Sequence, residues 1–118
     1  MNSIILQQYG LEMRKTNGPY DGYVKGPLEA YIYIYRHPDD VQEFIDDVQL
    51  AIDGNFNQID DPDWGGGLTP NIEAYWYAQI TPTHFEIRQY PTPYEDRQII
   101  PLEDWKEILL SWKECIQQ

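Results

Sequence analysis

Two neighbouring segments in which apolar and polar residues alternate constrain the fold of this chain most. Residues 72–80 read Ile-Glu-Ala-Tyr-Trp-Tyr-Ala-Gln-Ile, so every second residue is aliphatic or tryptophan. Residues 83–90 continue the alternation, with Phe85 and Ile87 on one side and polar or charged residues opposite. A period of two is typical of β-strands that bury one face. Because Thr81 and Pro82 alone separate the segments, the pattern predicts an antiparallel hairpin.

Other segments predict further strands and loops. Residues 29–36 alternate in the same way, which predicts a third strand, and residues 4–9 predict a short additional one. The two sides of the segment 29–36 are Tyr31, Tyr33 and Tyr35, and Ala30, Ile32 and Ile34. Glycine and proline predict loops at residues 16–27, with Tyr23 and Val24 paired at a sheet edge, and at residues 55–70 and 91–98.

Two segments have the spacing of amphipathic helices. The first covers residues 39–52, beginning after Pro38 and ending before Gly54, and the second opens at Pro101. The apolar residues of the first are Val41, Phe44, Ile45, Val48 and Ile52. Those of the second are Leu102, Trp105, Ile108, Leu109, Trp112 and Ile116. Each set forms one stripe, which we expect to face the core.

These elements predict an α+β fold: an antiparallel sheet of three or more strands with two helices packed on one face. The length of 118 residues suits one hydrophobic core, so we expect a single domain over residues 1–118. The other face of the sheet would carry a cluster of tyrosines: Tyr31, Tyr33, Tyr35, Tyr75 and Tyr77. This face is either open to a partner or covered by a loop or the N-terminal segment.

The charge of the chain excludes several classes of function. It carries 20 Asp and Glu against 8 Lys and Arg, a net charge of −12, and would repel nucleic acids and anionic membranes. Apolar runs are far shorter than the roughly 20 residues of a membrane-spanning helix. The N-terminal residues lack the pattern of a signal peptide, and Cys115 is the single cysteine. We therefore expect a soluble cytoplasmic protein.

The excess of acid falls in one window. Residues 37–87 contain 11 Asp and Glu and no Lys or Arg. Asp40, Glu43 and Asp47 lie on the predicted helix 39–52, where like charges three or four residues apart oppose helix formation by about 0.2–0.5 kcal/mol per pair. This cost favours a surface that is selected to meet a basic partner. The alternative is a solvated surface that keeps the protein soluble.

The loop that follows this helix contains three more aspartates and a tryptophan. Asp60, Asp61 and Asp63 directly precede Trp64. The segment is either an ordinary flexible loop or a partner-binding loop in which Trp64 is an apolar anchor. A calcium loop counted from Asp60 ends at Asn71, where calcium binding requires a glutamate.

Motifs for catalysis are weak. The two histidines are isolated, without cysteine or histidine at metal-binding spacing. The sequence contains no G-x-S-x-G nucleophile motif. We therefore predict no catalytic residues, no metal site, no cofactor and no enzymatic activity.

The last third of the chain carries a recognisable pattern. A strand pair is followed by a polar turn with Tyr94-Glu95-Asp96, then by Ile99-Ile100-Pro101-Leu102-Glu103-Asp104-Trp105, Ile108-Leu109 and Trp112. This pattern resembles the C-terminal helix of small bacterial immunity proteins from contact-dependent inhibition and related polymorphic toxin systems. The resemblance implies a cytosolic antidote that binds a toxin domain, often a nuclease, and blocks it without catalytic residues of its own.

The combined expectation is an immunity protein for a basic toxin. We expect Asp60, Asp61 and Asp63 to pair with Lys or Arg of the toxin, with Trp64 as the anchor. The long-range field would come from Asp40, Glu43 and Asp47, and further contact area from Tyr33, Tyr35, Tyr75 and Tyr77. The alternative is an acidic adaptor that binds another basic protein, and an enzyme is a third, weaker alternative.

Overall fold

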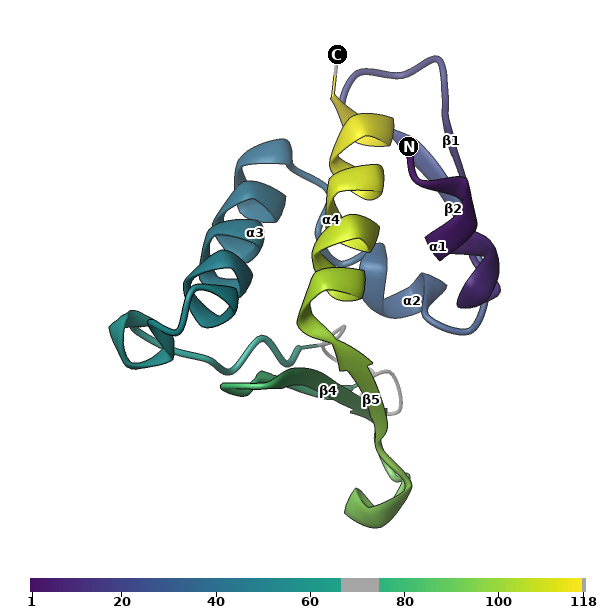
Figure 1. Ribbon diagram of the computed structural model, residues 1–118. Coiled ribbons are helices and arrows are strands. Elements are labelled where there is room, and N and C mark those ends of the chain that lie inside the picture. Colours follow the sequence, from purple (N-terminus) through teal and green to yellow (C-terminus); the bar gives the residue numbers. More distant parts are fainter. Residues whose placement is uncertain (67–74, 118) are drawn as a thin grey trace. The chain divides into compact units, whose positions relative to one another are not determined.

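The computed structural model describes residues 1–66 and 75–117 (Figure 1). The chain divides into two compact units. The elements are α1 (Ser3–Gln8), β1 (Glu12–Lys15), β2 (Gly22–Lys25), α2 (Glu29–Ile32), α3 (Pro38–Ile52), η1 (Phe56–Gln58), β3 (Trp76–Ile80), β4 (His84–Gln89), η3 (Tyr94–Asp96), β5 (Gln98–Pro101) and α4 (Leu102–Ile116). The first unit comprises Met1–Ile45 and Lys106–Gln118, and the second comprises Asp46–Trp105. The two long helices contribute residues to both units. A single domain over the whole chain stays a prediction.

The second unit contains a three-stranded antiparallel sheet in the order β3-β4-β5. Ala78 of β3 pairs with Ile87 of β4, and Phe85 of β4 pairs with Ile100 of β5. These side chains are buried on one face, and Trp105 in the first turn of α4 stacks on Phe85 with ring centroids 4.3 Å apart. The predicted hairpin is confirmed, although residues 72–74 of its first strand lie outside the described residues. With helices packed against the sheet, the α+β fold class is confirmed.

The third strand of this sheet is β5, which begins at Gln98, the last residue of the predicted polar turn, and ends at Pro101, where the prediction opened the last helix. The turn ends at Arg97, after η3, and Gln98 begins to pair with β4. Ile100 is buried, whereas its neighbour Ile99 is exposed. The two isoleucines thus follow the alternation of a strand, but four residues are too few for that pattern to stand out in the sequence.

The strand predicted at residues 29–36 is wrong. Glu29–Ile32 forms the short helix α2, and the amides of Ile34 and Tyr35 continue its local hydrogen bonding by donating to the carbonyls three residues earlier. Leu28, Tyr31 and Ile32 are buried, a spacing of three and four that belongs to a helix. Because the segment satisfies both periods, its alternation alone could not decide between strand and helix.

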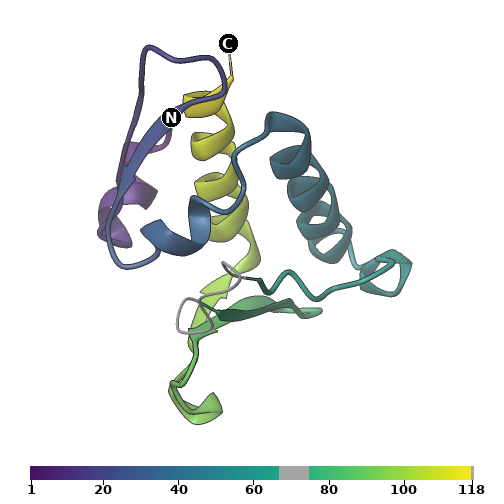
Figure 2. The same ribbon diagram turned by 180° about the vertical axis from the view of Figure 1, so that it is seen from behind.

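The predicted strand at residues 4–9 is also wrong, because this segment forms α1. The Asn2 side chain accepts a hydrogen bond from the Ile5 amide at 3.1 Å and thereby caps the helix. The first unit also contains the hairpin β1-β2, in which Met13 lies opposite Val24. The expected pairing of Tyr23 and Val24 is therefore confirmed. This hairpin lies beside the C-terminal half of α4 in both views (Figure 2).

The helices α3 and α4 confirm the two predicted helical segments. Val41, Phe44 and Val48 are fully buried in α3, and the predicted apolar residues of α4 are all buried. In the first unit, the Trp112 indole donates to the Tyr35 carbonyl at 2.6 Å. Within the described ranges 1–66 and 75–117, the structure contains no helix with the length and apolar content needed to cross a membrane.

Candidate functional site

The negative charge is divided very unevenly between the two units. The second unit carries twelve Asp and Glu against two Arg, a net charge of −10, whereas the first carries eight against six Lys and Arg, a net charge of −2. A compact body of 60 residues with this imbalance has a strong negative potential. The second unit is therefore the acidic part of the protein.

The acidic residues of α3 are mostly exposed. Asp40 and Glu43 belong to the first unit, and no described cation lies within ion-pair distance of either carboxylate. Asp47 belongs to the second unit and is half-buried, with its carboxylate accepting a hydrogen bond from the Trp64 indole at 3.1 Å. Asp40 and Glu43 are thus free to contribute long-range field, whereas Asp47 also has a structural contact.

The aspartate loop, residues 60–66, is hydrogen-bonded along β3. The Ile80 amide donates to the Pro62 carbonyl, the Trp64 amide to the Ala78 carbonyl, and the Gly66 amide to the Trp76 carbonyl, at 2.9–3.0 Å. Residues 62–66 therefore form an irregular, strand-like segment that pairs with β3 at the outer edge of the sheet. A loop held in this way presents its side chains in defined positions.

Asp60, Asp61 and Asp63 are all exposed on this loop, and no described Lys or Arg pairs with them. Two of them stabilise the loop backbone: Asp61 accepts from the Asp63 amide at 2.9 Å, and Asp63 accepts from the Gly65 amide at 2.8 Å. Each carboxylate keeps further acceptor capacity that faces solvent. The structure thus brings these three predicted residues together on one fixed segment.

Trp64, the predicted apolar anchor, has a contact within the protein. It is half-buried, and its indole N–H is engaged with Asp47. The ring therefore helps to fasten the aspartate loop to the α3 residues of the second unit. Its role as a contact for a partner stays a prediction.

The predicted tyrosine face formed by neighbouring strands is wrong, because residues 29–36 are not a strand. Tyr33 is exposed and Tyr35 is half-buried after α2, in the first unit. Tyr75 and Tyr77 lie in the second unit with ring centroids 5.0 Å apart, and Tyr90 lies 6.4 Å from Tyr77. A smaller tyrosine cluster therefore remains on β3 and its neighbour.

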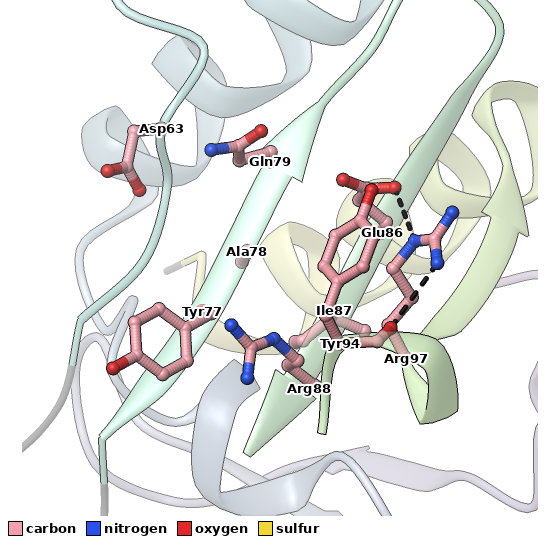
Figure 3. Close-up of a pocket in the computed structure, with 9 residues that line it drawn as sticks. All are labelled: Asp63, Tyr77, Ala78, Gln79, Glu86, Ile87, Arg88, Tyr94 and Arg97. Atoms are coloured by element: carbon pink, nitrogen blue, oxygen red, sulfur yellow. Dashed lines mark hydrogen bonds and ion pairs between the residues drawn. The ribbon is translucent and has the colours of Figure 1, made fainter. Parts of the chain in front are cut away.

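Beside this cluster, the outward face of the sheet contains a hollow of about 110 Å³ (Figure 3). Tyr77, Gln79, Glu86 and Arg88 line it from β3 and β4, together with Asp63 from the loop, and Tyr94 and Arg97 from the turn after β4. Sequence reasoning missed this site. One sequence feature could have indicated it. Arg88 and Arg97, the first Lys or Arg residues after Arg36, lie on either side of the tyrosine- and proline-rich stretch 90–94.

Glu86 is the most enclosed carboxylate of the hollow. It accepts hydrogen bonds from Arg97 Nε at 2.8 Å and from His84 Nε2 at 3.1 Å. Burial acts to raise the pKa of Glu86, but the hydrogen bonds and charges of Arg97 and His84 outweigh it and hold the pKa below its ordinary value. Glu86 is therefore ionised at neutral pH and fixes Arg97.

The lowered pKa of Glu86 predicts a pH-dependent contribution to stability. The contribution is complete above the ordinary pKa of 4.5 and is lost as the pH falls through the lower folded-state pKa. We expect Glu86→Gln to lower the free energy of unfolding by about 1 kcal/mol at pH 7 and by much less near pH 3. Urea unfolding at both pH values measures the difference, with the exposed Glu95→Gln as control. A loss of equal size at both pH values contradicts the assignment.

No protein-family model, curated protein or solved structure matches this chain. Among the residues that the structure describes, no three His, Cys, Asp or Glu are grouped so that they could hold a metal ion. The candidate site consists of a fixed acidic loop beside a hollow lined by tyrosine and arginine.

Proposed function

We propose that this protein is a non-catalytic immunity protein, which binds a basic toxin domain in the cytoplasm and neutralises it. The observation that carries the proposal is the charge of the second unit, at −10, with three exposed aspartates on a segment fastened to β3. The C-terminal pattern from Ile99 to Trp112 supports the same function through its resemblance to bacterial immunity proteins.

The physical basis is electrostatic complementarity. A nuclease active site is basic because its substrate is a polyanion, so carboxylates on a fixed loop can occupy the positions of phosphates. Opposite charges also raise association rates, from about 10⁵–10⁶ M⁻¹s⁻¹ for neutral surfaces towards about 10⁸–10⁹ M⁻¹s⁻¹ at low salt. Fast association suits an antidote that must reach the toxin before the toxin acts.

Co-expression tests the proposed function. Each product of the genes adjacent to this one is expressed in a bacterial host, and any that arrests growth is then expressed with and without the 118-residue chain. We expect the chain to restore growth and to co-purify with the toxin, and an unrelated toxin of similar charge to remain lethal. Growth arrest that the chain does not relieve, in cells where both proteins are soluble, would reject the proposal.

A further inference from the structure

The hollow on the sheet gathers all the positive charge of the second unit. Arg88 and Arg97 are the two Lys or Arg residues in the sequence 46–105, and both line the hollow. The surrounding unit carries twelve Asp and Glu. The hollow, which Asp63 of the aspartate loop also lines, therefore differs from the rest of this acidic unit in containing two guanidinium groups.

The two arginines have different partners. Arg97 is neutralised by Glu86, and its guanidinium lies 4.0 Å from the ring centroid of Tyr94. No described carboxylate lies within ion-pair distance of Arg88. Arg88 is therefore the guanidinium of the hollow without a described ion-pair partner, and Asp63, which lines the same hollow, is the carboxylate without one.

Arg88 is nevertheless held in one orientation. Its guanidinium lies 4.3 Å from the ring centroid of Tyr77, the residue directly opposite it in the strand register, and 5.9 Å from that of Tyr94. Its Nη1 donates to the Thr92 carbonyl at 2.7 Å. Figure 3 shows the side chain turned towards Tyr77. The order of this side chain is thus established before any ligand binds, which lowers the entropic cost of binding.

The remaining donors of Arg88 match a carboxylate. Nε and Nη2 donate to no acceptor among the described residues, and together they form one edge of the planar guanidinium. This edge is the fork that pairs with both oxygens of a carboxylate. A polyphosphate has the same oxygen chemistry, but the −10 charge of the unit opposes the approach of a polyanion several times more strongly than that of a single carboxylate.

The size of the hollow points to one side chain of a protein. Its volume of about 110 Å³ is well below the roughly 300–1,000 Å³ of pockets for metabolites and drugs. Exposed Tyr77 and Tyr94 line it, and tyrosine and arginine are among the residue types that dominate binding energy in protein interfaces. We propose that Arg88 binds one Asp or Glu side chain of a protein partner, between the rings of Tyr77 and Tyr94.

The contact at Arg88 would be attractive to a negative group, whereas the aspartate loop attracts positive ones. It does not depend on the identity of the toxin. A basic partner that presents cations to the aspartate loop would present one carboxylate to Arg88. Such a pair of opposite contacts fixes the orientation of a complex, because a rotated partner would place like charges together.

The test uses the isolated chain and NMR titration. The probe is N-acetyl-glutamate N-methylamide at constant ionic strength, with N-acetyl-glutamine N-methylamide as the uncharged counterpart and inorganic phosphate as a third ligand. We expect the Arg88 Nε–H and Tyr77 ring signals to shift saturably with the glutamate probe, with half-saturation on the order of 1–50 mM for so small a ligand. The glutamine probe should shift them less than one fifth as far.

Arg14 supplies an internal control within the same protein. Its guanidinium also lies over a tyrosine ring, 4.0 Å from Tyr23, but Arg14 is exposed and does not line the hollow. We expect the Arg14 Nε–H signal to show no saturable shift with the glutamate probe. Arg14→Gln should leave binding of the probe unchanged, and Arg88→Lys should weaken it at least threefold. Equal shifts at Arg14 and Arg88, equal effects of both probes, tighter binding of phosphate, or no saturation by 100 mM would each overturn the proposal. These measurements need no toxin, so they are independent of the co-expression result.

Discussion

Replacing Asp60, Asp61 and Asp63 with asparagine is expected to weaken binding to the toxin about 10- to 100-fold, as the loss of three interfacial charges predicts. Asparagine keeps an oxygen acceptor at each position, so the bonds from the Asp63 and Gly65 amides can persist. Replacement of the same three residues with lysine should weaken binding further, because it adds repulsion and removes those acceptors. Both variants are measured by surface plasmon resonance against the toxin identified by co-expression.

The dependence on salt distinguishes this electrostatic role from a general loss of fold. Each removed charge should make the fall of affinity with salt concentration shallower, mainly through the association rate. The matched control neutralises three acids of the first unit, with Glu12, Glu29 and Glu107 changed to glutamine. Total charge changes equally in the two triple variants. Equal affinity of the aspartate-loop variant and the wild-type chain would remove this loop from the interface.

The elements that could be predicted from the sequence are those with long, unambiguous periodicity. α3 and α4 each span 15 residues, so a helical stripe repeats about four times, and the β3-β4 hairpin combines two alternating segments with a short turn. The strand prediction for residues 29–36 was wrong because Leu28, Tyr31 and Ile32 also have helical spacing. The contacts that favour α2 come from other parts of the first unit, which a local sequence pattern does not show. β5 was too short to be distinguished from its turn.

The candidate site was predictable only in part, for a similar reason. Charge is visible in a sequence, so the aspartate loop and its exposure followed from composition. Its attachment to β3 depends on backbone hydrogen bonds that no side-chain pattern encodes. The hollow forms where the outward face of β4 meets the turn containing Tyr94, and that meeting requires β5, whereas the prediction placed the third strand at residues 29–36.

Removing the Trp105 side chain is expected to have the largest effect on stability. Its ring is fully buried and lies nearly parallel to Phe85, with an interplanar angle of 6°. Truncating a buried tryptophan to alanine typically costs about 3–5 kcal/mol, a large part of the roughly 5–15 kcal/mol that stabilises a folded domain. We expect Trp105→Ala to lower the Tm by at least about 10 °C, measured by far-ultraviolet circular dichroism.

Two further variants separate the stacking of Trp105 from the bulk it fills. Trp105→Phe retains an aromatic ring against Phe85 and should recover more than half of the lost stability, whereas Ile99→Ala, at an exposed position of β5, should change it by less than about 0.5 kcal/mol. An equal loss in Trp105→Phe and Trp105→Ala would show that ring contact is not what stabilises the unit. Trp105 also belongs to the C-terminal pattern on which the resemblance to immunity proteins rests, and its position is in the core. The pattern therefore carries information about folding, and we assign the proposed specificity for a partner to the charged and tyrosine-rich surface of the second unit.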